Sequence, residues 1–272
     1  MNPGKLYVCP TPIGNLEDIT IRTLNVLKEV DLIAAEDTRN SLKLLNHYEI
    51  KKSLTSYHKY NINQKSQSLI EKMKNGTNIG LISDAGMPGI SDPGQELIKM
   101  AIDEGIHVEV LPGPTASITA LVLSGLNTDK FVFEGFLDSK SSQRKRQLEV
   151  LNQEERTLIF YESPHRLLKS LEDMNDILGN REIAVARELT KYYEEVFRGT
   201  IREAIEHFGN KAIKGEIVLV VQGGKLEEEE IDIEAELLKY IDSGHSKKEA
   251  VKKLSKDKNL NRNLLYKISL KI

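Results

Sequence analysis

The stretch that decides the fold runs from Ile79 to Gly94 and reads IGLISDAGMPGISDPG. It opens as a short apolar run, typical of a buried strand, which ends at Ser83-Asp84. Residues 84–94 hold three glycines, two prolines and two aspartates, and a helical pattern then restarts at Gln95. The pattern predicts a strand, a shaped loop and a helix. Open α/β sheets bind ligands at the carboxyl ends of their strands, so we expect a ligand at this loop. The alternative is a tight, irregular connection that binds nothing.

Length and composition place the chain among globular proteins. Its 272 residues predict roughly two domains. Hydrophobic residues make up 39% and charged residues 29%, and no apolar run is long enough to span a bilayer. No secretory signal is recognisable at the start. The single cysteine, Cys9, has no disulfide partner, and no histidine pair has a metal-ligand spacing, so we expect a cytoplasmic protein without a metal site.

The net charge of -3 conceals an uneven distribution of charge. Residues 227–236 hold seven acidic side chains and no basic ones, whereas residues 239–272 hold ten Lys/Arg against three Asp/Glu. A mid-chain basic cluster comprises Lys140, Arg144, Lys145 and Arg146. Exposed basic clusters favour a polyanionic partner such as RNA. The alternative is that these charges lie on solvated helix faces.

The order of predicted elements indicates an α/β protein. Strands alternate with helices through residue 124, which is typical of a parallel sheet covered by helices on both faces. A second α/β half follows the basic cluster. We therefore predict domains at residues 1–124 and 125–225, followed at 226–272 by an acidic linker and a small basic, helix-turn-helix-like module.

The loops lack the common catalytic signatures, including the phosphate loop, the dinucleotide-binding turn and the nucleophile elbow. They offer carboxylates, hydroxyls and apolar side chains instead, at Glu36, Asp37, Asp84, Met87, Ile90, Asp92, Thr115 and Ser117. Such a set suits a ligand that carries hydroxyls, an amine and a positive centre. S-adenosylmethionine has these features.

Eight blocks, in order between residues 6 and 222, resemble the signatures of the ribosomal RNA small subunit methyltransferase I family, within the tetrapyrrole methylase superfamily. The blocks span residues 11–16 (TPIGNL), 35–39 (AEDTR), 83–94 (SDAGMPGISDPG), 112–116 (PGPTA), 133–137 (FEGFL), 160–166 (FYESPHR), 186–191 (ARELTK) and 215–221 (GEIVLVV). The basic tail resembles the small C-terminal helical domain of that family. Departures from the pattern are modest, and they fall at Lys59, Met87, Thr115 and Asp138.

The resemblance implies a two-domain, tetrapyrrole-methylase-like α/β fold with the cofactor in the cleft between the domains. It further implies a homodimer that uses S-adenosylmethionine to methylate the ribose 2′-hydroxyl of a cytidine in the decoding region of 16S ribosomal RNA, within the 30S subunit. Two alternatives remain open from the sequence. One is a tetrapyrrole (precorrin-type) C-methyltransferase, and the other is a non-catalytic RNA-binding ribosome assembly factor.

Carried over position by position, the resemblance implies cofactor contacts at Pro12, Asp84, Met87, Thr115, Ala116, Ser117, Tyr161, Ala186 and Glu216. Methyl transfer to a hydroxyl needs in-line alignment and gains from a nearby base or positive group. Our catalytic candidates are therefore strand-end residues that should face the cleft, namely Glu36, Asp37, Arg39, Glu162, His165, Arg187, Glu188 and Lys191. The alternative for each is a structural or RNA-positioning role. The mid-chain basic cluster is predicted to bind RNA.

Overall fold

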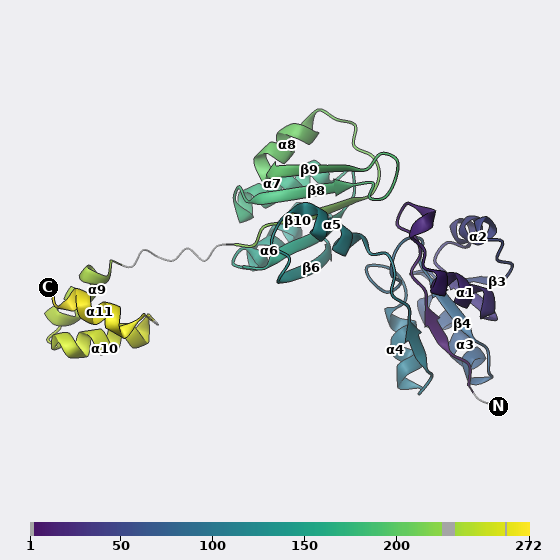
Figure 1. Cartoon of the computed structure of the whole chain (residues 1–272), viewed down its shortest axis with the longest axis horizontal. Coiled ribbons are helices and arrows are strands. Elements are labelled where there is room, and N and C mark those ends of the chain that lie inside the picture. The colour runs from purple at the N-terminus through teal and green to yellow at the C-terminus, as the bar shows by residue number, and fades with distance from the viewer. Residues whose placement is uncertain (1–2, 225–231, 259) are drawn as a thin grey trace. The chain divides into compact units, whose positions relative to one another are not determined.

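The computed structural model describes residues 3–224, 232–258 and 260–272, so residues 227–231 of the predicted acidic linker lie outside the described residues. The chain forms two compact units, Met1–Gly224 and Lys225–Ile272, and each is considered by itself (Figure 1). Among the described residues, no helix has the length and apolar character needed to cross a membrane.

The first sheet is fully parallel, as the alternation of elements predicts. It has the strand order β3-β2-β4-β1-β5 and is made of β1 (Leu6–Val8), β2 (Leu32–Ala35), β3 (Ser53–Ser56), β4 (Ile79–Ile82) and β5 (Val108–Val110). Strand β3 was not predicted, because its sequence SLTS is polar and it lies at the sheet edge. The central strand β4 is buried along its whole length, which explains its continuous apolar run.

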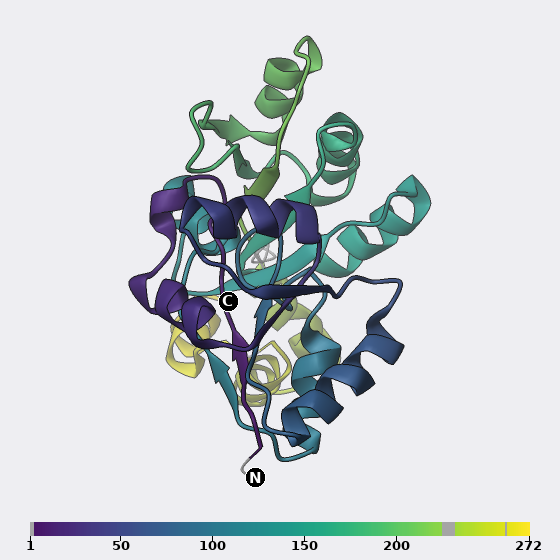
Figure 2. The same cartoon turned by 90° about the vertical axis from the view of Figure 1, so that its right-hand side faces the viewer.

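Helices cover both faces of this sheet (Figure 2). Alternate residues of a strand point to opposite faces, so Ile33 packs toward one side and Ala34 toward the other. One face is covered by α1 (Ile21–Glu29), which Thr20 caps, and by α2 (Thr38–His47). The other is covered by α3 (Ile62–Lys74) and α4 (Gln95–Asp103).

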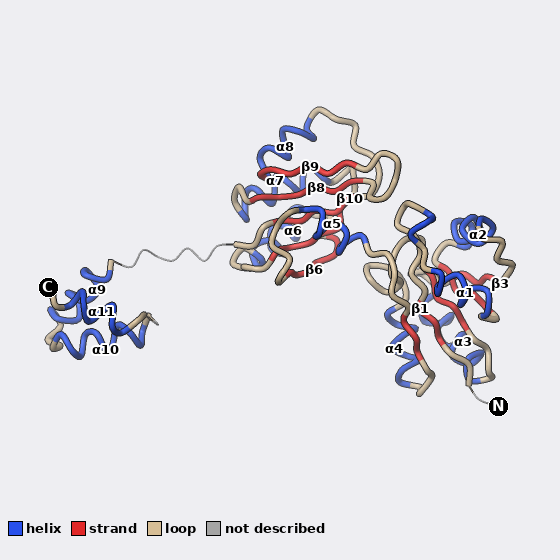
Figure 3. The backbone as a smooth tube through the Cα atoms, in the orientation of Figure 1, coloured by secondary structure: helices blue, strands red, loops and turns tan. Residues whose placement is uncertain are grey.

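The second sheet is mixed. It has the order β6-β7-β10-β8-β9, and only the β6–β7 pair is parallel. Its strands, shown in red in Figure 3, are β6 (Phe131–Phe136), β7 (Thr157–Glu162), β8 (Glu182–Arg187), β9 (Glu195–Thr200) and β10 (Ile217–Val221). One face packs against α6 (Ser141–Leu151), α7 (Leu167–Leu178) and α8 (Ile201–Gly209).

Helix α5 (Ala116–Ser124) joins the two sheets into one unit. It follows β5 of the first sheet, yet its Ala120 and Leu121 pack in one cluster with Ile159 and Val220 of the second sheet. Ile13, from the loop after β1, belongs to the same cluster. The first half of the chain is therefore anchored on the second sheet at two places. The predicted boundary at residue 124 stays a prediction.

The C-terminal unit has its own small core. Helices α9 (Ile233–Asp242), α10 (Lys247–Asp257) and α11 (Arg262–Ser269) enclose Leu237, Ala250, Val251, Leu254 and Leu265. Ser246 begins α10 with a capping box that includes Glu249. The lysines of α10 lie outside this core.

A buried ion pair joins α6 to α7. The side chain of Arg144 is only 2% exposed, and its Nη2 lies 2.6 Å from Oδ2 of Asp173. Ser141 donates to the same carboxylate, and Arg144 Nη1 donates to the carbonyl oxygen of Asp138 at 3.0 Å. Buried charges are tolerated when they are paired and hydrogen-bonded in this way. The pair therefore holds α6, α7 and the loop after β6 together.

We expect Asp173→Ala to destabilise the protein by about 3–5 kcal/mol, because it leaves the Arg144 guanidinium buried without its counter-charge. The free energy of unfolding, measured in urea, checks this. Asp176→Ala is the matched control: Asp176 pairs with Lys145 on the surface of the same helices, so its loss should cost less than about 1 kcal/mol. Equal effects of the two substitutions would contradict this account of the pair.

Candidate active site

The loop after β4, residues 83–94, is fastened to the loop after β1. Thr11 N donates to Gly86 O at 2.9 Å, and Gly86 N donates to Thr11 O at 3.0 Å. Thr11 Oγ1 also donates to Ser83 O at 3.1 Å. Gly86 has φ +78°, a conformation that glycine adopts without strain. We call residues 83–94 the central loop, and these bonds give it a defined shape.

A cavity of about 400 Å³ lies between the strand ends of the two sheets. We call it the large cavity, and its volume is in the range of small-molecule sites. From the first half of the chain, the lining residues are Ile13, Glu36, Asp84, Ala85, Gly86, Met87, Ile90, Ser91, Asp92, Thr115, Ala116 and Ser117. The second half lines it with Phe136, Tyr161–Pro164, Leu189 and Gly215–Val218.

Carboxylates gather on one side of the large cavity. Glu36 follows β2, Asp84 and Asp92 belong to the central loop, and Glu216 comes from the second half. Asp84 is held in place because its two oxygens accept from Asp37 N at 3.2 Å and from Asn40 Nδ2 at 3.0 Å. This side of the cavity therefore carries a negative field.

Proximity and burial raise two of the pKa values in this group. Burial, followed by the charges of Glu36 and Asp84, raises the pKa of Asp92 to about 7. Burial and the charge of Asp84 also raise the pKa of Glu36 above its usual range. Lys59 opposes both shifts. A bound cation would relieve this repulsion, so the cavity favours a positively charged ligand.

The rest of the lining is apolar and aromatic. It includes Ile13, Met87, Ile90 and Leu189. The ring of Tyr161 meets that of Phe136 edge-on, with 5.6 Å between the centroids. A ligand that fits here combines an apolar part, polar groups and a positive centre. The residues present thus fit S-adenosylmethionine.

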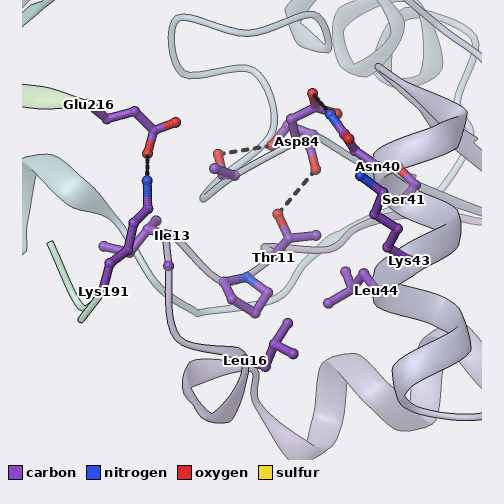
Figure 4. A pocket seen from close by; sticks show the side chains of 14 residues that line it. Thr11, Ile13, Leu16, Asn40, Ser41, Lys43, Leu44, Asp84, Lys191 and Glu216 are labelled. Atoms are coloured by element: carbon purple, nitrogen blue, oxygen red, sulfur yellow. Dashed lines mark hydrogen bonds and ion pairs between the residues drawn. The ribbon is translucent and has the colours of Figure 1, made fainter. Parts of the chain in front are cut away.

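A smaller cavity of about 310 Å³ adjoins the large one (Figure 4). The two share Ile13, Asp84, Ala85 and Glu216 in their linings. On the α2 side the small cavity is lined by Asn40, Ser41, Lys43 and Leu44. Lys191 lines it from the second half, and its Nζ donates to Glu216 Oε2 at 2.9 Å. A substrate in the small cavity would lie next to a ligand in the large one.

The predicted cofactor contacts mostly come together. Asp84, Met87, Thr115, Ala116, Ser117, Tyr161 and Glu216 all line the large cavity. Pro12 lines the small cavity instead. Ala186 is buried in β8 beside Val218 of β10 and lines neither.

The predicted catalytic residues are dispersed. Glu36 and Glu162 line the large cavity and Lys191 lines the small one. Glu162 is saturated, because its carboxylate accepts from Ser163 N and Ser170 Oγ and pairs with Arg166 at 2.8 Å. A side chain so fully bonded, and 1% exposed, fastens the loop after β7 to Ser170 of α7, and its catalytic role stays a prediction.

The other catalytic candidates line neither cavity. Asp37 caps α2 and pairs with Arg39, and hydrogen bonds from Arg39 lower its pKa to about 2. Arg39 itself is 86% exposed. His165 is exposed, and its Nε2 lies 3.4 Å from Ser163 Oγ. The remaining two candidates form ion pairs within the protein. Arg187 pairs with Glu195, and Glu188 pairs with Lys191.

The mid-chain basic cluster is divided by burial. Lys140, which precedes α6, and Arg146, in the middle of α6, are exposed, and Lys145 pairs with Asp176 at 2.8 Å. Arg144 is enclosed in its pair with Asp173, so its charge does not reach the surface. We therefore remove Arg144 from the predicted RNA-binding set.

Comparison with known proteins gives one consistent result. Residues 5–205 match the family described as "Tetrapyrrole (Corrin/Porphyrin) Methylases". The chain is 48% identical over 272 residues to "Ribosomal RNA small subunit methyltransferase I" of Halalkalibacterium halodurans, covering 97% of this chain and 94% of that protein. The chain belongs to the ribosomal RNA small subunit methyltransferase I family.

Two further relatives of this family member are informative. The Thermotoga maritima protein of the same name is 49% identical over 220 residues, which are 81% of this chain and 99% of that protein. Uroporphyrin-III C-methyl transferase from Thermus thermophilus, solved in complex with S-adenyl homocysteine, superposes with a TM-score of 0.58. At 18% identity, covering 80% of this chain and 97% of that chain, it is similar in fold alone.

The prediction of site residues omitted several that line the large cavity, notably Phe136, Leu189 and Gly215. Each lies within one of the family blocks, so its place in a block could have identified it as a site residue. Asp92 was noted as a possible ligand group without being assigned to the site. Its position beside Glu36 depends on how the central loop folds back, which spacing along the chain does not reveal.

We expect Asp92 to lower the free energy of unfolding of this family member as pH rises from about 4 to about 7. The folded-state pKa of Asp92, about 7, lies above the ordinary aspartate value. The folded state therefore retains a proton that the unfolded chain has released, and that stabilisation is lost as pH approaches 7. Asp92→Asn should reduce the decline by about 1–3 kcal/mol, measured by urea unfolding at about pH 5 and pH 8.

The matched control is Asp103→Asn, because Asp103 is an exposed aspartate on α4. It should leave the pH dependence of unfolding unchanged. If the stability of the Asp92→Asn variant fell with rising pH as steeply as that of the parent chain, the carboxylate cluster would not be the source of the pH dependence.

Proposed function

We propose that this chain transfers a methyl group from S-adenosylmethionine to the ribose 2′-hydroxyl of a cytidine in the decoding region of 16S ribosomal RNA. The observation that carries the proposal is the pair of adjoining cavities at the strand ends, built by residues of the family blocks. The nearly full-length similarity to proteins named ribosomal RNA small subunit methyltransferase I supports the RNA substrate.

When bound, S-adenosylmethionine supplies a methyl group activated by a positive sulfonium. The large cavity would hold it through the carboxylates of Glu36, Asp84 and Asp92, and Ile13, Met87 and Leu189 would line its apolar parts. The fixed central loop orients these groups before the substrate arrives. Such preorganisation brings the reacting atoms into line, which accounts for a large share of the rate in transfers of this kind.

The substrate ribose would enter beside the small cavity. The 2′-hydroxyl must lose its proton during or after the attack, and a base whose pKa lies near the working pH does this best. Asp84 and Glu216, the carboxylates that line both cavities, lie where a proton acceptor for this hydroxyl would act. Glu162 acts as a positioning residue.

The same proposal includes the setting of the reaction. The substrate would be the 30S subunit, because a decoding-region target is built from folded RNA. The chain would act as a homodimer in the cytoplasm. The proposed division into domains at residues 124 and 225 places the large cavity between the first two.

Nucleoside mass spectrometry of 30S subunits tests the proposal. Subunits from cells that lack this gene are incubated with the purified chain and S-adenosylmethionine, and 2′-O-methylcytidine should appear. Asp84→Asn should reduce the yield at least about 10-fold, because it removes a charge from the cofactor side, whereas Asp103→Asn should not. Binding of S-adenosylmethionine without any methylated nucleoside would refute the RNA substrate and favour a macrocyclic one.

The C-terminal unit adds a separate source of RNA affinity in this proposal. Helix α10 carries exposed Lys247, Lys248, Lys252, Lys253 and Lys256. The match to the Thermotoga maritima relative covers 99% of that protein but only 81% of this chain. About a fifth of this chain therefore has no counterpart in that relative. The C-terminal unit is about that size. We infer that it strengthens binding to RNA and takes no part in the methyl transfer.

Ending the chain at Gly224 should therefore leave the affinity for S-adenosylmethionine unchanged and weaken binding to 30S subunits. The slope of log K against log salt should fall by about 0.7–0.9 for each phosphate contact that is lost. A full-length variant with Lys247, Lys248, Lys252 and Lys253 changed to Gln is the matched control, and it should reproduce the reduced slope. An unchanged slope in both variants would contradict the role of α10.

A further inference from the structure

Two neighbouring aromatic side chains stand in solvent at the loop that joins β8 to β9. Tyr192 is 93% exposed and Tyr193 is 70% exposed. Their rings contact each other edge-on, with 4.9 Å between the centroids and an interplanar angle of 89°. Exposing two rings to water forgoes the free energy that their burial would provide. Such a pair therefore calls for an explanation in terms of a partner.

The backbone beneath these rings is strained. Glu188 has φ +52° and Thr190 has φ +64°, values that side chains with a Cβ rarely adopt. For Thr190, a β-branched residue, the strain is larger still. Strain of this kind persists only where surrounding contacts maintain it, and it concentrates at binding and catalytic sites.

The surrounding contacts come from two separate parts of the chain. Asn15 N donates to Thr190 Oγ1 at 2.9 Å, and Glu188 Oε1 accepts from Glu216 N at 3.0 Å and from Lys191 Nζ at 2.8 Å. The approach is so close that a Cβ on Gly14 would lie 2.6 Å from Leu189 O. These contacts fix the backbone of the loop, while the rings of Tyr192 and Tyr193 remain exposed to solvent.

The held residues are also the ones that meet the cavities. Leu189 lines the large cavity and Lys191 lines the small one. Tyr192 and Tyr193 follow Lys191 directly in the chain and line neither cavity, so the loop that carries them continues from the small cavity into solvent. A substrate strand that leaves this site would pass close to them.

The composition of the loop indicates what kind of partner fits. Around the two rings the loop carries Glu188, Thr190, Lys191 and Glu194, which are polar or charged. Large contiguous apolar patches mark many protein-binding surfaces, and beyond the two rings the exposed part of this loop offers none. An unpaired nucleobase needs only one ring face against which to stack, whatever the base.

We propose that Tyr192 and Tyr193 form a stacking platform for an unpaired nucleobase of the RNA substrate, next to the methylated nucleotide. This inference rests on the proposed function, because it takes RNA to be the substrate. Stacking on the platform would hold the base out of its RNA helix and so fix the position of the neighbouring ribose. In-line alignment at the methyl group depends on that position.

Methylation of 30S subunits by aromatic and non-aromatic variants provides the first test. The double variant Tyr192→Ala, Tyr193→Ala should lower kcat/KM for 30S subunits at least about 10-fold, as expected for the loss of one stacked base. Its affinity for S-adenosylmethionine, measured by calorimetry, should equal that of the parent chain. Tyr192→Phe with Tyr193→Phe should keep kcat/KM within about 2-fold, because stacking needs the ring and not the hydroxyl. Ile102→Ala, on the exposed side of α4, is the matched control and should have no effect.

A single tryptophan reports the contact directly. The chain contains no tryptophan, so Tyr193→Trp places the only indole of the protein in the platform. Adding 30S subunits that lack the modification should quench its emission, and adding S-adenosylmethionine alone should not. Sedimentation velocity of the double alanine variant establishes whether its oligomeric state matches that of the parent.

The outcomes separate the platform from the proposed function. If the parent chain methylates 30S subunits and the double alanine variant does so equally well, the platform is refuted and the function stands. Equal losses in the phenylalanine and alanine variants would refute stacking, since the hydroxyls would then be what matters. A loss that accompanies a changed oligomeric state would assign the rings to a contact between copies of the chain. No methylation by the parent would overturn the function itself.

Discussion

The pairing of Thr11 with Gly86 is the contact on which the site depends. Two reciprocal backbone hydrogen bonds join the loop after β1 to the central loop. Because adjacent Ile13 packs into the second sheet, this bridge also ties the central loop to the other half of the chain. Both cavities share Ile13, Asp84 and Ala85, which lie within a few residues of the bridge. The site is therefore assembled by loops that hold one another.

The site also holds charge in an unfavourable arrangement. The charges of Glu36 and Asp84 raise the pKa of Asp92, the charge of Asp84 raises that of Glu36, and none of the described residues that line the large cavity is an arginine. Like charges near one another destabilise a folded protein unless something compensates. The cost is acceptable where a cationic ligand binds, because the ligand recovers the lost stability on binding. Function and stability are opposed at this point, as they often are at active sites.

Elsewhere in the same unit, charged residues are neutralised in pairs and serve the architecture. Asp173 encloses Arg144 between α6 and α7, and Arg166 with Ser170 encloses Glu162 beneath the loop after β7. The sequence analysis predicted that Arg144 binds RNA, because it lies in a basic cluster, and that Glu162 is catalytic, because it lies at a strand end. Their ion pairs hold strand-end loops in place, and Glu162 does so while it lines the large cavity.

The sequence by itself determined the elements and the kind of site. The apolar run at Ile79–Ile82, the Gly/Pro-rich segment after it and the strand-helix alternation predicted a parallel sheet with a loop site, because local periodicity and turn chemistry depend on near neighbours. The family blocks covered most residues that line the large cavity.

Tertiary structure alone decided which charges face the cavity. Arg144 and Lys145 are adjacent in the chain, yet one is enclosed and the other reaches the surface, since burial depends on packing between distant elements. The same holds for Asp92, whose pKa is raised by its burial and by the charges of Glu36 and Asp84. It holds also for the loop that carries Tyr192 and Tyr193, which Asn15 and Glu216 hold from far away in the chain.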